Sequence, residues 1–331
     1  MFLRINYRAI GHMHHRTRTT LRDGLCLAIL ASFTFGLIAL VSSGHPSPRL
    51  SASAEQASVA HGRLPPAALT IHVSETRTAG QLSAAFDRIG FDLNSVAAGY
   101  ISVPRVLLTR LPRDLDRIDN PDLRKVVFLR SLLPVILQVN EQIGQDRARL
   151  LQIRHEVNIG QRLSPDEVQW IMALADAYDE PEANLDALAR KVDVIPPSQA
   201  LAQAIEESGW GTSRIAREQN ALFGQFGQDE SGQWDYRNFP SLLAAVKAYA
   251  HNLNTHHAYR EFRAARAQMR RQSGGIDAYA LAGTLHRYSE RGDGYVQDLR
   301  SIIRANDLEA FDTARLNNLA SSATIVASND R

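Results

Sequence analysis

The stretch "ALAQAIEESGWGTS", residues 200–213, is apolar with helical spacing until it meets two glutamates, and it then breaks at Gly-Trp-Gly. Two prolines, Pro196 and Pro197, favour extended backbone just before it, and Ser198 is suited to cap a new helix. Gly209 can adopt the left-handed conformation that ends a helix. We therefore expect a helix whose last turn carries both glutamates.

The two glutamates differ in their expected surroundings. A helix C-terminus carries partial negative charge, so a carboxyl group there holds its proton more tightly, and the neighbouring Trp210 can exclude water and raise the pKa further. Glu207 projects over a face of small residues that includes Ala204, whereas Glu206 points to the opposite side and is expected to be solvated. Glu207 is therefore the candidate general acid. Taken alone, an ordinary surface helix that ends in glutamates is the commoner explanation.

The composition is that of a globular chain with one basic end. Of 331 residues, 44% are apolar and 22% are charged, which is enough for a sizeable core. The single cysteine, Cys26, excludes an intrachain disulfide. The first 23 residues hold five arginines and one aspartate, a charge of +4, so the rest of a chain with net charge +2 carries −2. The basic character belongs to the tail, and we expect no nucleic-acid partner.

The N-terminal part has the pattern of a membrane anchor. Residues 24–44 are uncharged and apolar over about the length that crosses a bilayer. The basic tail, 1–23, predicts a cytoplasmic N-terminus and an exported remainder. We expect a single transmembrane signal-anchor, and cleavage as a signal peptide stays open because small residues follow the run. A flexible linker rich in Ser, Ala and Pro is expected at 45–75.

Beyond the linker we expect a helical accessory region, 76–160, and a second domain, 161–308. The first part of the accessory region suggests short segments that wrap over a larger body. A long helix is expected from 121 to about 143, with a kink at Pro134. The "SPDE" of Ser164–Glu167 is a strong helix start, with a capping Ser, a first-turn Pro and a Glu three residues after the cap.

Most of the second domain is expected to be helical. The segment 223–239, dense in Gly, Gln and aromatic residues, is expected to be a loop or a small hairpin. Residues 309–331 are expected to form a disordered tail. By hydrophobic spacing, helices are expected at about 183–192, 198–208, 240–254, 260–269, 276–285 and 295–305.

Two runs of sequence resemble a known family. "PPSQALAQAIEESGWGTSRIAREQNALFGQFG" (196–227) and "YSERGDGYVQDLRSII" (288–303) resemble the glucosaminidase domain of glycoside hydrolase family 73 and, more closely, Bax-type bacterial membrane proteins that carry it. The resemblance implies a mainly α fold, a lysozyme-like α+β domain with a small β-hairpin lobe. It implies hydrolysis of N-acetylglucosaminyl-β-1,4 linkages in peptidoglycan glycan strands, on the periplasmic side of the bacterial inner membrane. Glu207, directly before Ser-Gly-Trp, matches the family's catalytic acid.

Further residues match functional positions of that family. Tyr288 matches a tyrosine regarded as important to catalysis, and Tyr295 matches a second tyrosine that floors the site. Asn220, Phe223 and Gly224 belong to a match with the "N-x-LFG" motif, which lies by the cleft in relatives. The resemblance thus adds Tyr288 as a catalytic residue and the other four as substrate-binding residues.

Aromatic side chains suit a site that binds sugar, because their stiff faces stack on sugar rings. We expect Trp210, Phe226 and Tyr236 to bind substrate. Phe223 suits the core equally well. Phe226 stands where many closer relatives are expected to have Trp, which leaves the details of sugar stacking open.

A second carboxylate is usual in glycoside hydrolysis. Glu290 is the first candidate because it lies between two tyrosines in a glycine-bearing segment, and an ion pair with Arg287 or Arg291 explains its place equally well. The substrate's acetamido group can also take this role. Weaker candidates are three acidic residues of the loop after "FGQFG": Asp229, Glu230 and Asp235.

Other chemistries find little support in the sequence. No histidine spacing indicates a metal site and no glycine loop indicates a bound nucleotide, so we expect no metal and no cofactor. The arginines between Arg260 and Arg271 are expected to form a solvated basic face. Two alternatives stay open: a lytic transglycosylase, which shares the lysozyme-like fold and uses one essential acid, and an envelope scaffold that binds glycan without cutting it.

Overall fold

The structure, a computed structural model, describes residues 78–106, 108–228, 233–273 and 275–317. All of them belong to one compact unit. The predicted membrane span at 24–44, with the tail and linker on either side of it, lies outside the described residues.

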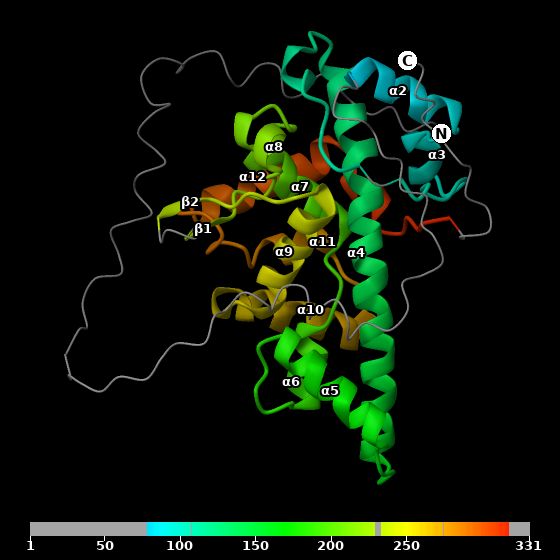
Figure 1. Cartoon of the computed structure of the whole chain (residues 1–331), viewed down its shortest axis with the longest axis vertical. Coiled ribbons are helices and arrows are strands. Elements are labelled where there is room, and N and C mark those ends of the chain that lie inside the picture. The colour runs from blue at the N-terminus through cyan, green and yellow to red at the C-terminus, as the bar shows by residue number, and fades with distance from the viewer. Residues whose placement is uncertain (1–77, 107, 229–232, 274, 318–331) are drawn as a thin grey trace, which may run out of the picture. The chain divides into compact units, whose positions relative to one another are not determined.

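Within these residues the chain is mainly helical and carries one small antiparallel hairpin, as predicted (Figure 1). The helices and strands, in chain order, are α2 (Ala79–Arg88), α3 (Leu93–Ala97), η2 (Leu115–Arg117), α4 (Pro121–Asn158), α5 (Pro165–Ala177), α6 (Leu185–Lys191), α7 (Pro197–Ser208), α8 (Arg214–Gln219), β1 (Phe226–Gln228), β2 (Trp234–Tyr236), α9 (Leu242–Thr255), η3 (His257–Tyr259), α10 (Arg260–Ser273), α11 (Ala278–Ala282), α12 (Asp293–Ala305) and η4 (Leu308–Phe311).

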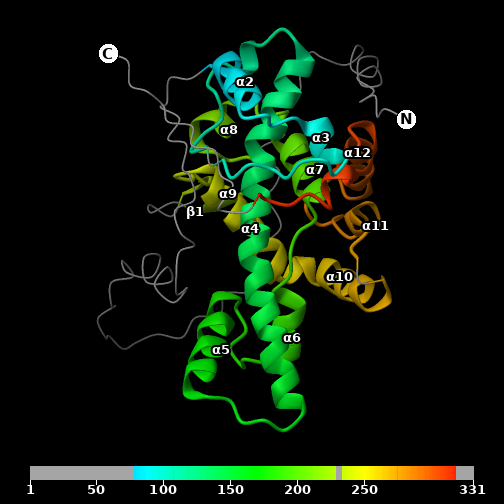
Figure 2. The ribbon, with the colours of Figure 1, turned by 90° about the vertical axis from the view of Figure 1, so that its right-hand side faces the viewer.

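The long helix α4 is the element against which α2, α6, α7 and α9 pack (Figure 2). It continues through Pro134 to Asn158, well beyond the predicted end near residue 143. Its second half was missed because that half is mostly polar, yet polar side chains there hold neighbouring helices. Arg147 donates hydrogen bonds to the carbonyls that end α6, and Arg149 lies over the ring of Trp170 in α5.

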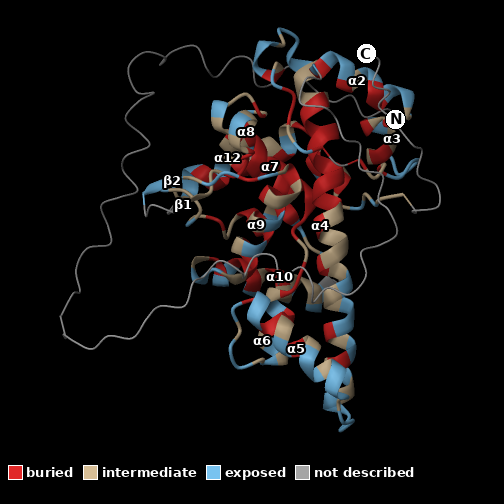
Figure 3. Cartoon of the chain, in the orientation of Figure 1, coloured by how far each residue is buried: buried red, intermediate tan, exposed pale blue. Residues whose placement is uncertain are grey.

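Burial along α4 changes from one end to the other (Figure 3). Its apolar residues from Val127 to Val139 are buried, while most residues near its C-terminal end are exposed. Among the described helices, α4 is the one long and apolar enough to cross a membrane by length and composition. Because its apolar part packs against other helices of the same unit, we assign it to the protein core.

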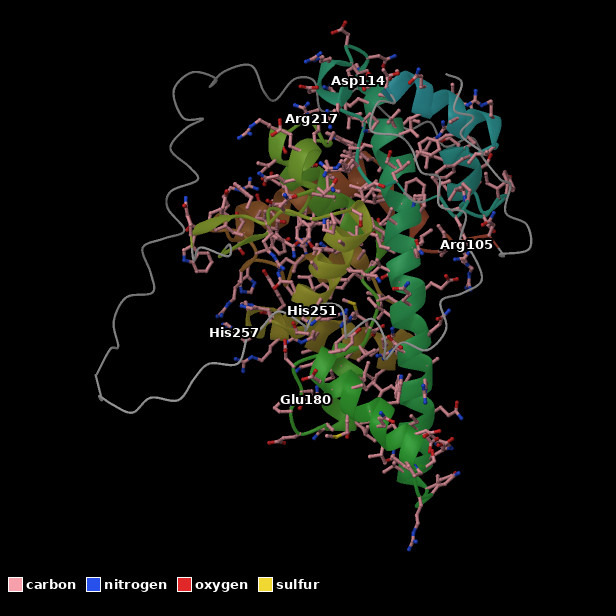
Figure 4. The ribbon with its side chains drawn as sticks, in the orientation of Figure 1. Arg105, Asp114, Glu180, Arg217, His251 and His257 are labelled. Atoms are coloured by element: carbon pink, nitrogen blue, oxygen red, sulfur yellow. The ribbon has the colours of Figure 1, made fainter. Side chains whose placement is uncertain are left out.

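The segment before α4 wraps over the rest of the unit, as predicted. The amide of Leu242, at the start of α9, donates to the carbonyl of Thr109 at 3.1 Å. Arg217 of α8 donates to the carbonyl of Arg113 and pairs with Asp116 at 2.8 Å. Figure 4 shows Arg217 on its helix and Asp114 in the wrapping segment.

Two predicted features of α5 and α10 have different outcomes. Ser164 caps α5 through a capping box with Glu167, as the sequence predicts. The predicted solvated basic face of α10 is confirmed for Arg260 and Arg271, which are exposed, and wrong for Arg263 and Arg266. Arg263 and Arg266 are buried, and the Arg266 guanidinium donates to four backbone carbonyls around the end of α6. Backbone carbonyls at a helix end are acceptors that periodicity does not reveal.

Helix α7 packs against α12, η4 and α4. It begins at Pro197, and Ser198, expected as its cap, is the second residue of the helix. Pro196 at the cap position makes no side-chain hydrogen bond to the first turn.

The predicted disordered tail was wrong for residues 309–317, since Phe311 is buried and Leu316 forms a parallel bridge with Val103. This segment is ordered because it packs against residues distant in sequence.

The hairpin and the core complete the unit. Strands β1 and β2 pair in antiparallel register, with Phe226 opposite Tyr236 and Gln228 opposite Trp234, which confirms the hairpin prediction. One cluster of buried side chains extends from Ala79 in α2 to Phe311 in η4. The boundary between two domains at residues 160 and 161 stays a prediction.

Candidate active site

The site is built on the C-terminal turn of α7. Gly209 ends the helix with φ 59°, and Glu206 and Glu207 both lie in the last turn, as predicted. The helix C-terminus lacks a basic residue in its final turn, so its partial negative charge is not offset by its own side chains.

The two carboxylates have different surroundings. Burial raises the pKa of Glu207 to about 7, and the nearby Glu206 charge adds to this increase. Hydrogen bonding with Tyr295 and the charge of Arg291 act in the opposite direction but are smaller than the effect of burial. Glu207 therefore holds a proton into the neutral pH range.

The motif glycine packs directly on the candidate acid. Gly224 has φ 61°, and a Cβ built on it would lie 2.6 Å from Oε2 of Glu207. Real Cβ atoms do not approach this closely, so only glycine leaves room for the carboxyl group in this position. Gly224, predicted to bind substrate, is thus in contact with Glu207 itself.

Tyrosines surround the same carboxyl group. The Tyr288 hydroxyl donates to the carbonyl of Phe223 at 2.9 Å, and the Tyr288 ring stacks on Tyr295 with centroids 5.5 Å apart. Tyr288 thereby holds the loop that ends in Gly224. Burial raises the pKa of both Tyr288 and Tyr295 well above the usual range, so both phenols stay protonated at neutral pH. A catalytic role of Tyr288 stays a prediction.

A buried hydrogen-bonded chain supports Tyr295 from behind. Gln203, one turn before Glu207 on α7, donates to the Tyr295 hydroxyl at 3.1 Å and accepts from the Tyr249 hydroxyl at 2.7 Å. Gln203 and Tyr295 are fully buried. Tyr249 was not predicted as part of the site, because its position on the buried face of α9 is that of an ordinary core residue.

Glu206 is not simply solvated, so that prediction needs correction. It pairs with Arg291, which also pairs with Asp298 at 2.6 Å. Arg291 follows Glu290 in the segment before α12. Glu206 is therefore already engaged in an ion pair, which leaves Glu207 as the candidate acid of this turn.

The described candidates for the second carboxylate are exposed, unlike Glu207. Glu290 is exposed. One alternative explained its place by an ion pair with Arg291, but Arg291 pairs with Glu206 and Asp298. Asp235 is exposed in β2, where its carboxylate accepts from the amide of Tyr236. Asp229 and Glu230 lie outside the described residues.

Three predicted substrate-binding residues make contacts within the protein, and their role in substrate binding stays a prediction. Trp210 packs edge-on against Phe128 and under Lys125, both from α4, rather than against the Glu207 carboxyl group. Asn220 is fully buried and donates to the carbonyl of Phe239. Phe223 is 1% exposed and stacks on Tyr249.

The hairpin gathers the remaining predicted aromatics. Phe226 stacks on Trp234, with centroids 6.2 Å apart, and meets Tyr236 edge to face at 5.1 Å. The three share one face of the hairpin because they occupy opposed and alternate positions. Trp234 is 51% exposed. This aromatic face is available to a sugar ring.

A metal centre finds no support in the described part of the chain. There, no three His, Cys, Asp or Glu side chains lie close enough together to hold an ion. That the protein needs no metal stays a prediction.

Comparison with known proteins gives three similarities. Residues 182–308 match the glucosaminidase family model, described as mannosyl-glycoprotein endo-beta-N-acetylglucosaminidase. Over 205 residues the chain is 34% identical to protein bax of Escherichia coli (strain K12), an alignment that covers 58% of this chain and 73% of that protein. The solved catalytic domain of the autolysin Auto from Listeria monocytogenes is 18% identical to this chain, with a TM-score of 0.27. The alignment covers 49% of this chain and 96% of that domain.

Proposed function

The chain belongs to the family of protein bax and carries a glucosaminidase domain, and from this premise we propose that it is a peptidoglycan hydrolase in which Glu207 is the general acid. The observation that carries the proposal is the close packing of the half-buried Glu207 against Gly224 at a helix C-terminus, with a pKa raised to about 7. A group with this pKa holds a proton and releases it readily near neutral pH, as general acid catalysis requires.

The reaction we propose is cleavage of N-acetylglucosaminyl-β-1,4 linkages. Glu207 protonates the oxygen that leaves the N-acetylglucosamine ring, and positive charge develops on that ring. The phenol of Tyr295 hydrogen-bonds with the acid, and that of Tyr288 holds the Phe223 carbonyl next to Gly224. On the other face of the ring, either Glu290 activates a water molecule that attacks the ring carbon, or the substrate's own acetamido oxygen attacks this carbon and water then opens the cyclic intermediate.

The aromatic face of the hairpin, formed by Phe226, Trp234 and Tyr236, supports binding of a glycan strand. Sugar rings present C–H faces that stack well on such side chains. We propose that residues 24–44 anchor the protein in the inner membrane of a bacterium, with the described unit in the periplasm where peptidoglycan lies.

The variant Glu207→Gln tests this proposal on purified sacculi. We expect loss of glycan cleavage by a factor of at least about 100, because the amide cannot donate a proton, with an unchanged circular dichroism spectrum. The matched control is Glu218→Gln, which removes an exposed carboxylate of α8 that pairs only with Arg214 in the same helix. Full cleavage by the Glu207 variant would contradict the assignment.

A lytic transglycosylase is the second candidate, because one buried acid suffices for it and Glu206 is already paired with Arg291. Mass spectrometry of the released fragments separates the two. Hydrolysis by the proposed enzyme leaves N-acetylglucosamine at the reducing end. An anhydro-muramyl end would favour the transglycosylase.

A further inference from the structure

Both ends of the catalytic helix α7 are held by residues outside the segment 182–308 that matches the family model. At its start, the Asp312 carboxylate accepts from the Ser198 amide at 2.8 Å and from the Ser198 hydroxyl at 2.7 Å. Pro196 at the cap position offers no such group, so Asp312 supplies the missing N-terminal cap from 114 residues away in sequence. We call this contact the start clamp.

The segment that carries Asp312 is itself fixed to the accessory region. Leu316 bridges to Val103, and the guanidinium of Arg105 donates to the carbonyl of Asn317 at 2.9 Å. The same guanidinium makes two 2.7 Å hydrogen bonds to Glu141 of α4, a bidentate pair with a fixed geometry. Figure 4 labels Arg105. The start clamp is therefore connected to α4.

At the other end, the turn after α7 is held against the accessory region. Gly209, Trp210 and Gly211 all have positive φ, between 59° and 74°, a conformation that a bulky residue such as Trp210 rarely adopts. A Cβ built on Gly211 would lie 2.6 Å from Leu111 and 2.9 Å from Leu115. We call this packing the end clamp.

The position of α7 matters because the acid fits its surroundings closely. Oε2 of Glu207 lies so near Gly224 that a methyl group added there would force the carboxyl group to move. A misplacement of about 1 Å in a catalytic group can cost on the order of 100-fold in rate. A helix transmits displacement along its axis, so loosening either end moves Glu207 relative to the Gly224 loop.

We infer that the accessory segment 103–130 and the C-terminal segment 309–317 are parts of the catalytic unit, and that the start and end clamps position Glu207. This inference rests on the proposed function. Asp312 and Leu115 are its positioning residues, since neither touches Glu207 and both act through α7.

Full-length Asp312→Ala, Asp312→Asn and Glu309→Ala test the start clamp on purified sacculi. We expect Asp312→Ala to lower kcat at least about tenfold with KM nearly unchanged. Asparagine should restore most of kcat, because its oxygen still accepts from the Ser198 amide and its NH2 group can donate to the Ser198 hydroxyl. The control Glu309→Ala removes an exposed carboxylate of the same segment and should not change kcat.

The end clamp is tested by Leu115→Ala against Leu82→Ala. Both leucines are buried in the accessory region, but Leu82 lies in α2, which packs on α4 rather than on the Gly211 turn. We expect similar losses in Tm, because both substitutions leave a cavity. At a temperature where both proteins are folded, we expect only Leu115→Ala to lower kcat by tenfold or more.

The outcomes separate the inference from the proposed function. If Glu207→Gln is inactive while Asp312→Ala and Leu115→Ala keep wild-type kcat, the clamps are structural only and the inference is wrong. If Glu207→Gln is active, the proposed function fails first. In that case NMR titration of Glu207 in Asp312→Ala decides the inference: an unchanged midpoint contradicts it, and a midpoint moved toward the ordinary value supports it.

Discussion

Glu207 and Glu206 are neighbours in sequence, yet the chain gives them different surroundings. Glu206 pairs with Arg291, while Glu207 faces Gly224 and the phenol of Tyr295, where burial raises its pKa more than any of these contacts lowers it. A single turn of helix thus holds both a structural carboxylate and a candidate acid, because adjacent positions on a helix face different ways.

Stability should therefore depend on pH through Glu207. Its pKa is raised from 4.5 in the unfolded chain to about 7 in the folded protein, so the folded state binds the proton more tightly. The stabilising contribution is complete below pH 4.5 and is lost as the pH rises through 7, by up to about 3 kcal/mol. Thermal melts should show Glu207→Gln gaining stability over wild type between pH 5 and 8. A constant difference across this range would show that Glu207 titrates normally.

Gly224 should be required for activity more than for folding. A methyl group at this position meets Oε2 of Glu207 and also disfavours the positive φ, so Gly224→Ala should lower kcat by about 100-fold. The matched control is Gly227→Ala in β1, whose added Cβ would meet only the flexible side chain of Arg237 at 3.4 Å. Assays of glycan release should find the control close to wild type, and equal rates for the two variants would argue against close packing on the acid.

At the scale of elements, α10 is fixed by one buried guanidinium. Arg266 is fully buried, donates to carbonyls at the end of α6 and lies 3.8 Å from Asp193, which also pairs with Arg270 and Arg147. Burial lowers the pKa of Arg266 to about 10, so it stays charged at neutral pH. The side chain thus joins α10 to the end of α6.

Replacing Arg266 by methionine should therefore destabilise the fold strongly. The apolar side chain fills the space but leaves buried carbonyls and Asp193 without its donors, which costs about 3 kcal/mol or more. Urea denaturation measures the loss. The exposed Arg271 of the same helix provides the control, since Arg271→Met should change stability by less than about 0.5 kcal/mol. A similar effect of both changes would show that Arg266 contributes no more to stability than a solvated arginine of the same helix.

The elements also show what sequence patterns can and cannot predict. Helix α7, its end at Gly209 and the capping box of α5 follow from local rules and were predicted. The second half of α4 was not, because its polar residues face helices that lie later in the chain. Periodicity reports an apolar face, and it is silent where charged side chains make the contacts.

At the scale of the whole unit, the candidate acid and its neighbours Gly224, Tyr288 and Tyr295 could be predicted from sequence, but the way they pack could not. Glu207 stands in a recognisable motif beside a helix end. Trp210 was expected to exclude water from it, but packs on α4, while Tyr288, Tyr295 and Gly224 take that place. The cap that Asp312 supplies could not be predicted, because its partner, Ser198, lies 114 residues earlier in the chain. Contacts of this range depend on the complete fold.

One measurement tests the central claim most directly, namely that the folded chain keeps Glu207 protonated into the neutral range. Carbon-13 NMR follows the glutamate carboxyl groups of the folded protein through a titration from pH 4 to 9, and the spectrum of Glu207→Gln assigns the signal by its absence. We expect a midpoint near pH 7 for Glu207, since burial opposes its ionisation. A midpoint near 4.5, the value of a hydrated glutamate, would contradict the account.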